Sequence, residues 1–375
     1  MHRHGRARPR MNIVVFCPSL IGDTVMATPT FRALRKGFPS GRLTAVVKPN
    51  VAPVLDGLDW FDEVVRFHPR SKDRGQRTLP LIRRLRAERP DAAVLLPNSI
   101  RTAAISRLAG IPRRVGYDRY ARGLLLTDRL APPRDAKGRL LPCPIVEYYL
   151  KLAHALGCPG DGVRLELPTT SADEAAADEA VAALGVDTSS GLVCLNTGGA
   201  FGPAKAWPVE YFGELARRLA AELDVAVVAL CGPSERDESR RIAELAGHPR
   251  VVSLADRPLS LGLSKAFVRR SSLLVTTDSG PRHFAAAFGT PVVTLFGPTR
   301  IEWTRTNHPQ ATHLYHPVPC GPCQRPICPL GHHQCMKLLT PDRVFDAARR
   351  MLDGRPIYRP NFPRLATKEA SWRPG

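Results

Sequence analysis

Residues 273–296 read LLVTTDSGPRHFAAAFGTPVVTLF. The apolar run Leu273–Val275 predicts a buried strand, and Val292–Phe296 predicts a second one. Between them, a Thr-Asp-Ser-Gly loop leads into a proline and a short Ala-rich helix; proline suits the first helical turn because its missing N–H is not needed there. Free backbone N–H groups at a helix N-terminus attract phosphates, and ligands of open α/β sheets bind at the carboxyl ends of strands. This stretch therefore predicts a strand–loop–helix–strand unit with an anion site.

The same alternation of strands and helices runs through both halves of the chain. We expect strands at 13–17, 43–47, 63–67, 92–96, 192–196, 225–230 and 251–254, and a helix over Asp23–Lys36. Such spacing is typical of parallel sheets built from βαβ units. Because a polar break separates the halves at Thr188–Gly191, we expect an α/β protein with two Rossmann-like domains, 11–185 and 186–353, that face a cleft. A basic tail, 354–375, is expected to be poorly ordered.

Size and charge limit the classes of function. The 375 residues suffice for two domains, and 54 Lys+Arg against 34 Asp+Glu give a net charge of +20. This excess favours a polyanionic partner, or else reflects an Arg-rich composition whose charges are simply solvated. Since no nucleic-acid-binding motif occurs, nucleic acid is disfavoured. No apolar stretch reaches the ~20 residues needed to span a bilayer, so we expect a cytoplasmic protein without a cleaved signal peptide, starting at Met1 or Met11.

The loop after the first strand carries a candidate catalytic group. Gly22-Asp23 lies at the turn into the first helix, where Asp23 would project into the cleft. A carboxylate there can act as a general base toward a hydroxyl nucleophile, or it can only cap the helix. The loop lacks Gly-x-Gly-x-x-Gly, which disfavours a dinucleotide oxidoreductase, and it lacks the Lys-Ser/Thr of a phosphate loop.

The second domain opens with a loop suited to a diphosphate. Residues 196–208 read NTGGAFGPAKAWP, and the glycines let the backbone approach a ligand closely. Lys205 adds a positive charge beside a bound diphosphate, or it is a solvated surface lysine. Glu235 follows the next strand, where it can accept hydrogen bonds from ribose hydroxyls or occupy a helix start.

Taken together, the motifs resemble a known family. In chain order they are Ile21-Gly22-Asp23, LPNS at 96–99, AGIPRRVGY at 109–117, FGPAK with Trp207-Pro208 at 201–208, TDSG with His283, and FGPT at 296–299. Each is weak alone, but their order and spacing are specific. Over residues 11–352 the chain resembles the ADP-heptose:lipopolysaccharide heptosyltransferases, family 9 of the glycosyltransferases, and among them heptosyltransferase II.

This resemblance implies a GT-B fold and an inverting, metal-independent transfer of heptose from ADP-heptose to the lipopolysaccharide inner core. It implies that Asp23 is the general base and that Lys205 neutralises the departing diphosphate. The implied donor-binding residues are Thr197, Gly198, Gly199, Lys205, Glu235, Asp278, Ser279, Gly280 and His283. On the acceptor side we expect Asn98, Arg113 and Arg114 to meet a phosphorylated glycolipid such as lipid A–inner core. The protein is then expected at the inner face of the cytoplasmic membrane, as a peripheral enzyme.

Two other functions stay open. One is a family relative that uses another nucleotide sugar or acceptor glycan. The other is a non-catalytic nucleotide-sugar-binding protein on the same fold, against which the retained Asp23 argues.

Four cysteines are clustered near the C-terminal end. Cys320, Cys323, Cys328 and Cys335 are separated by two, four and six residues. Four thiolates suit a structural zinc or, as a second choice, an iron–sulfur cluster; the alternative is a packed loop without metal. These residues lie outside the donor motifs, so a metal here would be structural and no cofactor is expected in catalysis.

Overall fold

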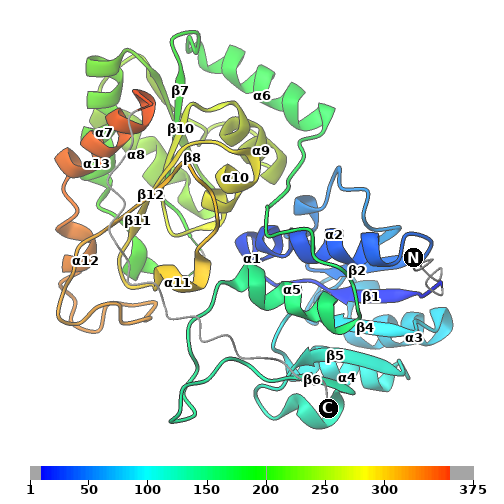
Figure 1. Cartoon of the computed structure of the whole chain (residues 1–375). Coiled ribbons are helices and arrows are strands. Elements are labelled where there is room, and N and C mark those ends of the chain that lie inside the picture. Colours follow the sequence, from blue (N-terminus) through cyan, green and yellow to red (C-terminus); the bar gives the residue numbers. More distant parts are fainter. Residues whose placement is uncertain (1–9, 200, 355–375) are drawn as a thin grey trace, which may run out of the picture.

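The computed structural model describes residues 10–199 and 201–354, which form two α/β halves (Figure 1). The first half holds a six-stranded sheet in the order β3-β2-β1-β4-β5-β6, and every neighbouring pair is parallel. Its strands are β1 (Ile13–Phe16), β2 (Leu43–Val47), β3 (Glu63–Arg66), β4 (Ala92–Leu95), β5 (Arg113–Tyr117) and β6 (Asp128–Leu130). Both faces are covered by helices, so β1, β2 and β4 are buried along their whole length.

The second half repeats this plan. Its sheet runs β12-β11-β10-β7-β8-β9, again with every neighbouring pair parallel. Its strands are β7 (Leu192–Asn196), β8 (Ala226–Leu230), β9 (Val251–Ser253), β10 (Leu273–Thr277), β11 (Val292–Phe296) and β12 (Ala311–Tyr315). In both sheets the strand order reverses beside the first strand of the half, at β1/β4 and at β7/β10. Ligands of such sheets bind at these reversal points.

The helices that bear on the site lie between the strands and at the junction of the halves. They are α1 (Ile21–Met26), α2 (Thr28–Gly37), α5 (Ile145–Ala155), α6 (Ser171–Leu184), α9 (Leu261–Arg270), α10 (Gly280–Phe288) and α11 (Ile301–Thr304). The remaining α-helices are α3 (Thr78–Glu88), α4 (Ile100–Leu108), α7 (Val209–Leu223), α8 (Arg236–Ala246), α12 (Gln334–Lys337) and α13 (Pro341–Leu352).

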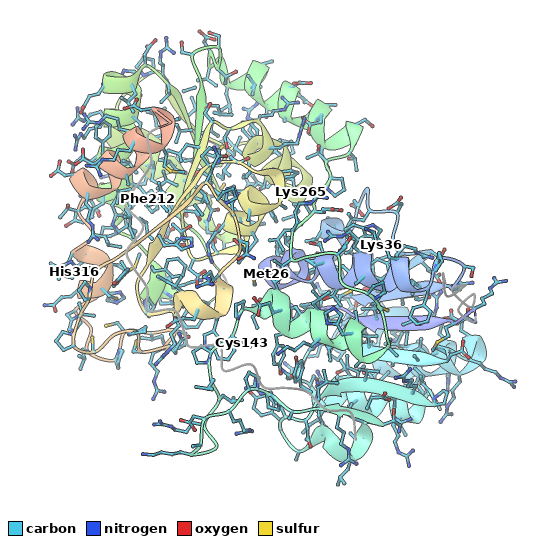
Figure 2. All side chains as sticks on the ribbon, viewed as in Figure 1. Met26, Lys36, Cys143, Phe212, Lys265 and His316 are labelled. Carbon is cyan, nitrogen blue, oxygen red and sulfur yellow. The ribbon has the colours of Figure 1, made fainter. Side chains whose placement is uncertain are left out.

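The two halves meet at α1 and α10. A Cβ placed on Gly280 would lie 3.3 Å from Ile21 Cγ2, and one on Gly22 would lie 2.7 Å from His283 Cδ2. A second contact involves Lys265 of α9, whose buried Nζ lies 3.4 Å from the carbonyl oxygen of Pro53 and 3.2 Å from Asp173 Oδ2 (Figure 2). The loops after β1 and β10 are thus brought face to face.

The expected α/β fold with two Rossmann-like halves is confirmed, with two kinds of local difference. The helix expected over Asp23–Lys36 is two helices, α1 and α2, because the chain turns at Ala27 and Pro29 stands in the first turn of the second one. The strands β5, β6 and β12 were not expected from the sequence. The division at 185/186 stays a prediction; α6 packs on α9 through an ion pair of Glu174 with Arg270 at 2.7 Å. The predicted basic tail lies outside the described residues except for Gly354.

Candidate active site

The loops at the two reversal points carry most of the predicted residues. Asp23 follows β1, and the loop that holds Lys205 follows β7. Asp278 and His283 follow β10, in the loop and first turn of α10. Because α1 contacts α10, groups from both halves come together at one place.

Asp23 lies in the first turn of α1 and is partly buried. Burial and, second, the negative charge of Asp278 raise the pKa of the Asp23 carboxyl to about 6. A carboxylate with such a pKa holds a proton more readily than an ordinary aspartate and is still mostly ionised at pH 7. This is the property required of a general base.

Asp278 is buried in a cationic surrounding. Arg282 Nη1, one helical turn further on, lies 3.1 Å from Asp278 Oδ1, and Thr304 donates a 3.2 Å hydrogen bond to the same oxygen. Burial alone would raise the pKa of Asp278, but the charges of Arg282 and Lys205 outweigh it and hold the pKa below its ordinary value. Asp278 is therefore an ionised acceptor and is poorly suited to take up a proton.

Lys205 is buried behind the glycine loop. Its Nζ donates a hydrogen bond to the Asp278 carbonyl oxygen and lies 5.3 Å from the centre of the Phe201 ring. A Cβ on Gly199 would come within 3.1 Å of this Nζ, so the lysine reaches along the loop backbone. Burial lowers the pKa of Lys205, which an approaching diphosphate would counteract.

Ser279 and Gly280 form the start of α10. Ser279 is the N-cap residue, and its hydroxyl accepts a 3.0 Å hydrogen bond from Asn196 Nδ2 and lies 3.1 Å from Thr276 Oγ1. These bonds link the carboxyl ends of β7 and β10. They leave the backbone N–H groups at the N-terminus of α10 available to an anion.

His283 is buried against the other half of the molecule. Burial and, second, Arg282 lower the pKa of His283 to about 3, so the ring is neutral at pH 7. Its Nδ1 is buried and has no hydrogen-bond partner among the described residues. Since buried polar atoms are normally paired, this nitrogen is a place where a ligand hydroxyl could bind.

The remaining donor-side residues lie beside Gly198. A Cβ on Gly198 would overlap Glu235 Oε1 at 1.8 Å, so only glycine allows this approach. Glu235 Oε2 accepts a 2.8 Å hydrogen bond from the Gly232 N–H, which is the helix-start role considered above. Thr197 Oγ1 donates to Glu238 Oε2 at 3.3 Å. The carboxylate of Glu235 thus lies directly beside Gly198, in the loop that follows β7.

The predicted acceptor residues are not equivalent. Asn98, after β4, lies between Arg122 Nη2 at 3.1 Å and the Tyr148 hydroxyl at 3.2 Å. Arg113 and Arg114 lie in β5: Arg113 contacts Asp128 at 2.8 Å, and Arg114 is buried with a 2.7 Å bond to the Leu125 carbonyl. Both guanidinium groups already hold their own half of the molecule together.

The four clustered cysteines lie in the segment between β12 and the end of α12.

Arg282, Thr304 and His313 were missed by the sequence reasoning. Arg282 Nη1 donates to Thr304 Oγ1 at 2.8 Å, and its Nη2 lies 3.4 Å from His313 Nε2. Asp278 precedes the N-cap of α10 and Arg282 lies in its first turn, four residues on, and this spacing could have indicated the ion pair. Thr304 and His313 are distant in sequence and carry no such signal.

Known proteins resemble this chain in sequence and in fold. The sequence profile of glycosyltransferase family 9 (heptosyltransferase) matches residues 78–334. Lipopolysaccharide heptosyltransferase 2 of Salmonella typhimurium is 27% identical, over 91% of this chain and 99% of its own. The structure of E. coli ADP-heptose LPS heptosyltransferase II is 25% identical with a TM-score of 0.74, over 92% of this chain and 99% of that one. E. coli heptosyltransferase WaaC with ADP-2-deoxy-2-fluoro heptose shares the fold, with 19% identity and a TM-score of 0.65 over 91% of this chain and 99% of that one.

Proposed function

The chain belongs to glycosyltransferase family 9, the heptosyltransferases, and on that premise we propose that it transfers heptose from ADP-heptose to the inner core of lipopolysaccharide. The observation that carries the proposal is the meeting of Asp23, with its raised pKa, and the Lys205–Asp278 pair of the other half. The first group can activate a hydroxyl, and the second can hold a sugar diphosphate.

In the proposed reaction the acceptor hydroxyl gives its proton to Asp23 as its oxygen attacks the anomeric carbon of the heptose. The bond from that carbon to the diphosphate oxygen breaks, and ADP leaves with the electron pair. Lys205 and the N-terminus of α10 stabilise the charge that develops on the diphosphate, which is the task that a metal ion performs in other glycosyl transfers. A single displacement inverts the anomeric centre.

Asp278 and His283 are proposed to bind sugar hydroxyls. Asp278 is ionised and accepts hydrogen bonds, while His283 offers its unpaired Nδ1. Glu235 is proposed to bind the ribose, with its Oε1 beside Gly198. Thr197, Gly198 and Gly199 belong to the same loop, and Asn98, which follows β4, is proposed to bind the acceptor.

The acceptor is proposed to be a phosphorylated glycolipid such as lipid A–inner core, reached from the inner membrane surface. Among the described residues no helix is both long and apolar enough to cross a bilayer. Tyr120 is 64% and Leu124 is 83% exposed, close in sequence to the basic Arg119, and such a combination suits an anionic lipid surface. Arg83 and Arg86 add exposed basic side chains on α3.

The test mixes purified protein with ADP-heptose and a lipid A–inner core acceptor, without added divalent metal. We expect ADP release coupled to a product that is heavier by one heptose. A panel of nucleotide sugars, tested for binding in parallel, identifies the donor. Binding of ADP-heptose without transfer would favour the non-catalytic alternative, and preference for another sugar would favour a relative with a different donor.

The matched variant is Asp23→Ala. We expect it to abolish turnover while ADP-heptose binding and the folded state are kept. Near-normal turnover of this variant would remove Asp23 as the base.

A further inference from the structure

Arg282 is buried beside Asp278, the carboxylate that is proposed to bind a sugar hydroxyl. It lies in the first turn of α10, four residues after Asp278. Its side chain is only 2% exposed, and arginine is almost never buried this deeply unless it is paired. Among the described residues Asp278 is the only carboxylate in an ion pair with it, at 3.1 Å. The positions of these two buried charges therefore depend on each other.

The hydrogen bonds of Arg282 close a ring with Asp278 and Thr304. Arg282 Nη1 donates to Asp278 Oδ1 at 3.1 Å and to Thr304 Oγ1 at 2.8 Å. The Thr304 hydroxyl in turn donates to the same Oδ1 at 3.2 Å. We term these three residues the Asp278 ring. Because each member contacts the other two, the ring fixes the carboxylate in one orientation, and none of its bonds uses Asp278 Oδ2.

The ring is anchored by an element outside α10. Thr304 belongs to α11, and α11 contacts α5 of the first half (Figure 1). A pair of residues four apart at one helix end would move together with that helix. The third member comes from another element, so it holds the carboxylate from a second direction.

The rest of the Arg282 guanidinium is surrounded by groups without negative charge. Its Nη2 lies 3.4 Å from His313 Nε2, and the group lies 4.9 Å from the centre of the Phe296 ring. Burial and, second, Arg282 itself lower the pKa of His313 to about 3, so this ring is neutral at pH 7. These contacts hold the guanidinium in place but do not compensate its charge, which leaves that task to Asp278.

Three other titratable groups act on Asp278. Lys205 donates a hydrogen bond to the Asp278 carbonyl oxygen rather than to its carboxylate. His283 is neutral at pH 7, because burial and then Arg282 lower its pKa to about 3. Asp23, from the first half, acts through the repulsion of like charges. Within the described part of the chain, Arg282 is thus the cation that contacts the Asp278 carboxylate itself.

We propose that Arg282 is a positioning residue for recognition of the donor sugar: it holds Asp278 through Oδ1, within the Asp278 ring, and so keeps Oδ2 for a sugar hydroxyl. This inference deepens the proposed function and rests on it, because the ligand it requires is a nucleotide sugar. Arg282 acts through Asp278 and does not touch the ligand. Without Arg282 the buried carboxylate would lose its partner, and it would turn away or take up a proton.

The first test compares the affinities for ADP-heptose and for ADP in the wild type and in Arg282→Met, by calorimetry. We expect the affinity for ADP-heptose to fall about 10- to 100-fold, the usual contribution of a hydrogen bond to a charged group. The affinity for ADP, which lacks the sugar, should fall less. Equal losses for both ligands would overturn the role in sugar recognition.

The matched control is Arg32→Met. Arg32 is also buried, and it pairs with Asp161 at 2.8 Å in the first half. We expect this variant to bind both ligands as the wild type does. A loss of ADP-heptose affinity as large as that of Arg282→Met would show that removing any buried arginine has this effect, and it would overturn the proposal.

The pH dependence of binding separates the positioning of a charge from a packing defect. In Arg282→Met, burial still raises the pKa of Asp278 and its main opposing charge is lost, so the carboxyl holds its proton to higher pH. We expect the loss of ADP-heptose affinity, relative to the wild type at the same pH, to be larger at pH 6 than at pH 8.5. In Arg282→Lys, which keeps the charge, the ratio should stay nearly constant. A ratio independent of pH in Arg282→Met would overturn the proposal.

A further pair of variants tests whether Arg282 acts through Asp278. Asp278→Asn removes the carboxylate, and the double variant Asp278→Asn, Arg282→Met removes both charges. No unpaired buried charge remains in the double variant, so it stays informative if Arg282→Met alone does not fold. We expect both variants to bind ADP-heptose equally weakly. An additional loss in the double variant would overturn the positioning role.

Failure of the proposed function would be visible in the wild-type protein. If the wild type preferred another nucleotide sugar, the heptose assignment would be wrong, and the same variants compared with that sugar would still decide the role of Arg282. A wild type that bound no nucleotide sugar more tightly than ADP would overturn both. Normal binding by the wild type with unchanged affinity in Arg282→Met would overturn the positioning role alone.

Discussion

At the scale of single residues, the environment of Asp23 predicts that removing its charge lowers the activity and raises the stability of the folded state. Its folded-state pKa of about 6 lies above the ordinary 3.8, so ionisation at neutral pH weakens the folded state. Asp23→Asn should lose turnover yet gain about 1–2 kcal/mol of unfolding free energy at pH 8, allowing for partial exposure. Urea unfolding and kinetics measured on the same samples check both, with exposed Asp59→Asn as the control.

The pH profile of the wild-type enzyme follows from the same shift. We expect kcat/KM to fall as the pH drops below about 6, because Asp23 then carries a proton and cannot accept another. An acidic limb near pH 4, typical of an exposed carboxylate, would contradict the burial argument.

Lys205 is expected to act on the leaving group. Lys205→Ala removes the buried positive charge beside Asp278 and should lower kcat by about 10²–10³, by analogy with the loss of one oxyanion donor. The control is Lys36→Ala, an exposed lysine that pairs with Asp161 on the surface (Figure 2). Equal losses in both variants would show that the effect is not specific to the site.

The sequence could predict that residues in loops after apolar strands belong to the site. It could not predict site residues that are contributed by other parts of the fold. Asp23, Lys205 and Asp278 each stand in a loop after an apolar run, so the parallel-sheet rule was enough to bring them to one edge. His313 comes from β12, and its contact with Arg282 depends on sheet order. The roles of all five residues remain predictions.

At the scale of elements, the contact between α1 and α10 depends on Gly22, which has no side chain. Gly22→Ala would place a methyl group 2.7 Å from His283 Cδ2, and His283 is too buried to move aside freely. Alanine is more favourable than glycine in a helix by about 0.5–1 kcal/mol, which offsets part of the cost of this close contact, so the free energy of unfolding should change little. We expect kcat/KM to fall about tenfold or more, since a misplacement of about 1 Å can cost 10²-fold.

The control for this element is Gly75→Ala, whose new Cβ meets only Asp73 Oδ1 at 3.2 Å. Equal kinetics for Gly22→Ala and wild type would mean that the two helices need not approach this closely during turnover.

Elements differed in how well the sequence specified them. Strands with unbroken apolar runs, such as β1 and β11, were predicted nearly to the residue. β5 was missed because it begins with two charged residues, Arg113 and Arg114. Their guanidinium groups are accommodated in the fold by hydrogen bonds to Asp128 and to backbone carbonyl oxygens. β12 was missed because Thr312 and His313 interrupt its apolar side chains, so it shows no apolar run.

At the scale of the whole molecule, buried histidines make stability depend on pH. Burial lowers the pKa of both His283 and His313 to about 3, with Arg282 as the second cause, whereas unfolded histidines titrate near 6.5. As the pH falls below 6.5 the unfolded chain gains two protons that the folded chain does not bind, so stability is lost. Asp23 has the opposite effect on stability. Because its folded-state pKa is raised to about 6, the folded state takes up this proton at a higher pH than the unfolded chain, and stability rises as the pH falls below 6.

The histidines should prevail because there are two of them and their shifts are larger. Taking these three groups alone, we expect about 3 kcal/mol less unfolding free energy at pH 5 than at pH 7. In the double variant His283→Gln, His313→Gln the sign should reverse, since only Asp23 of the three then remains, whereas exposed His154→Gln should behave as wild type. Urea unfolding at the two pH values measures this difference. If the double variant kept the wild-type slope, the acid sensitivity would have to come from the surface ion pairs, and the two buried rings would not be held neutral.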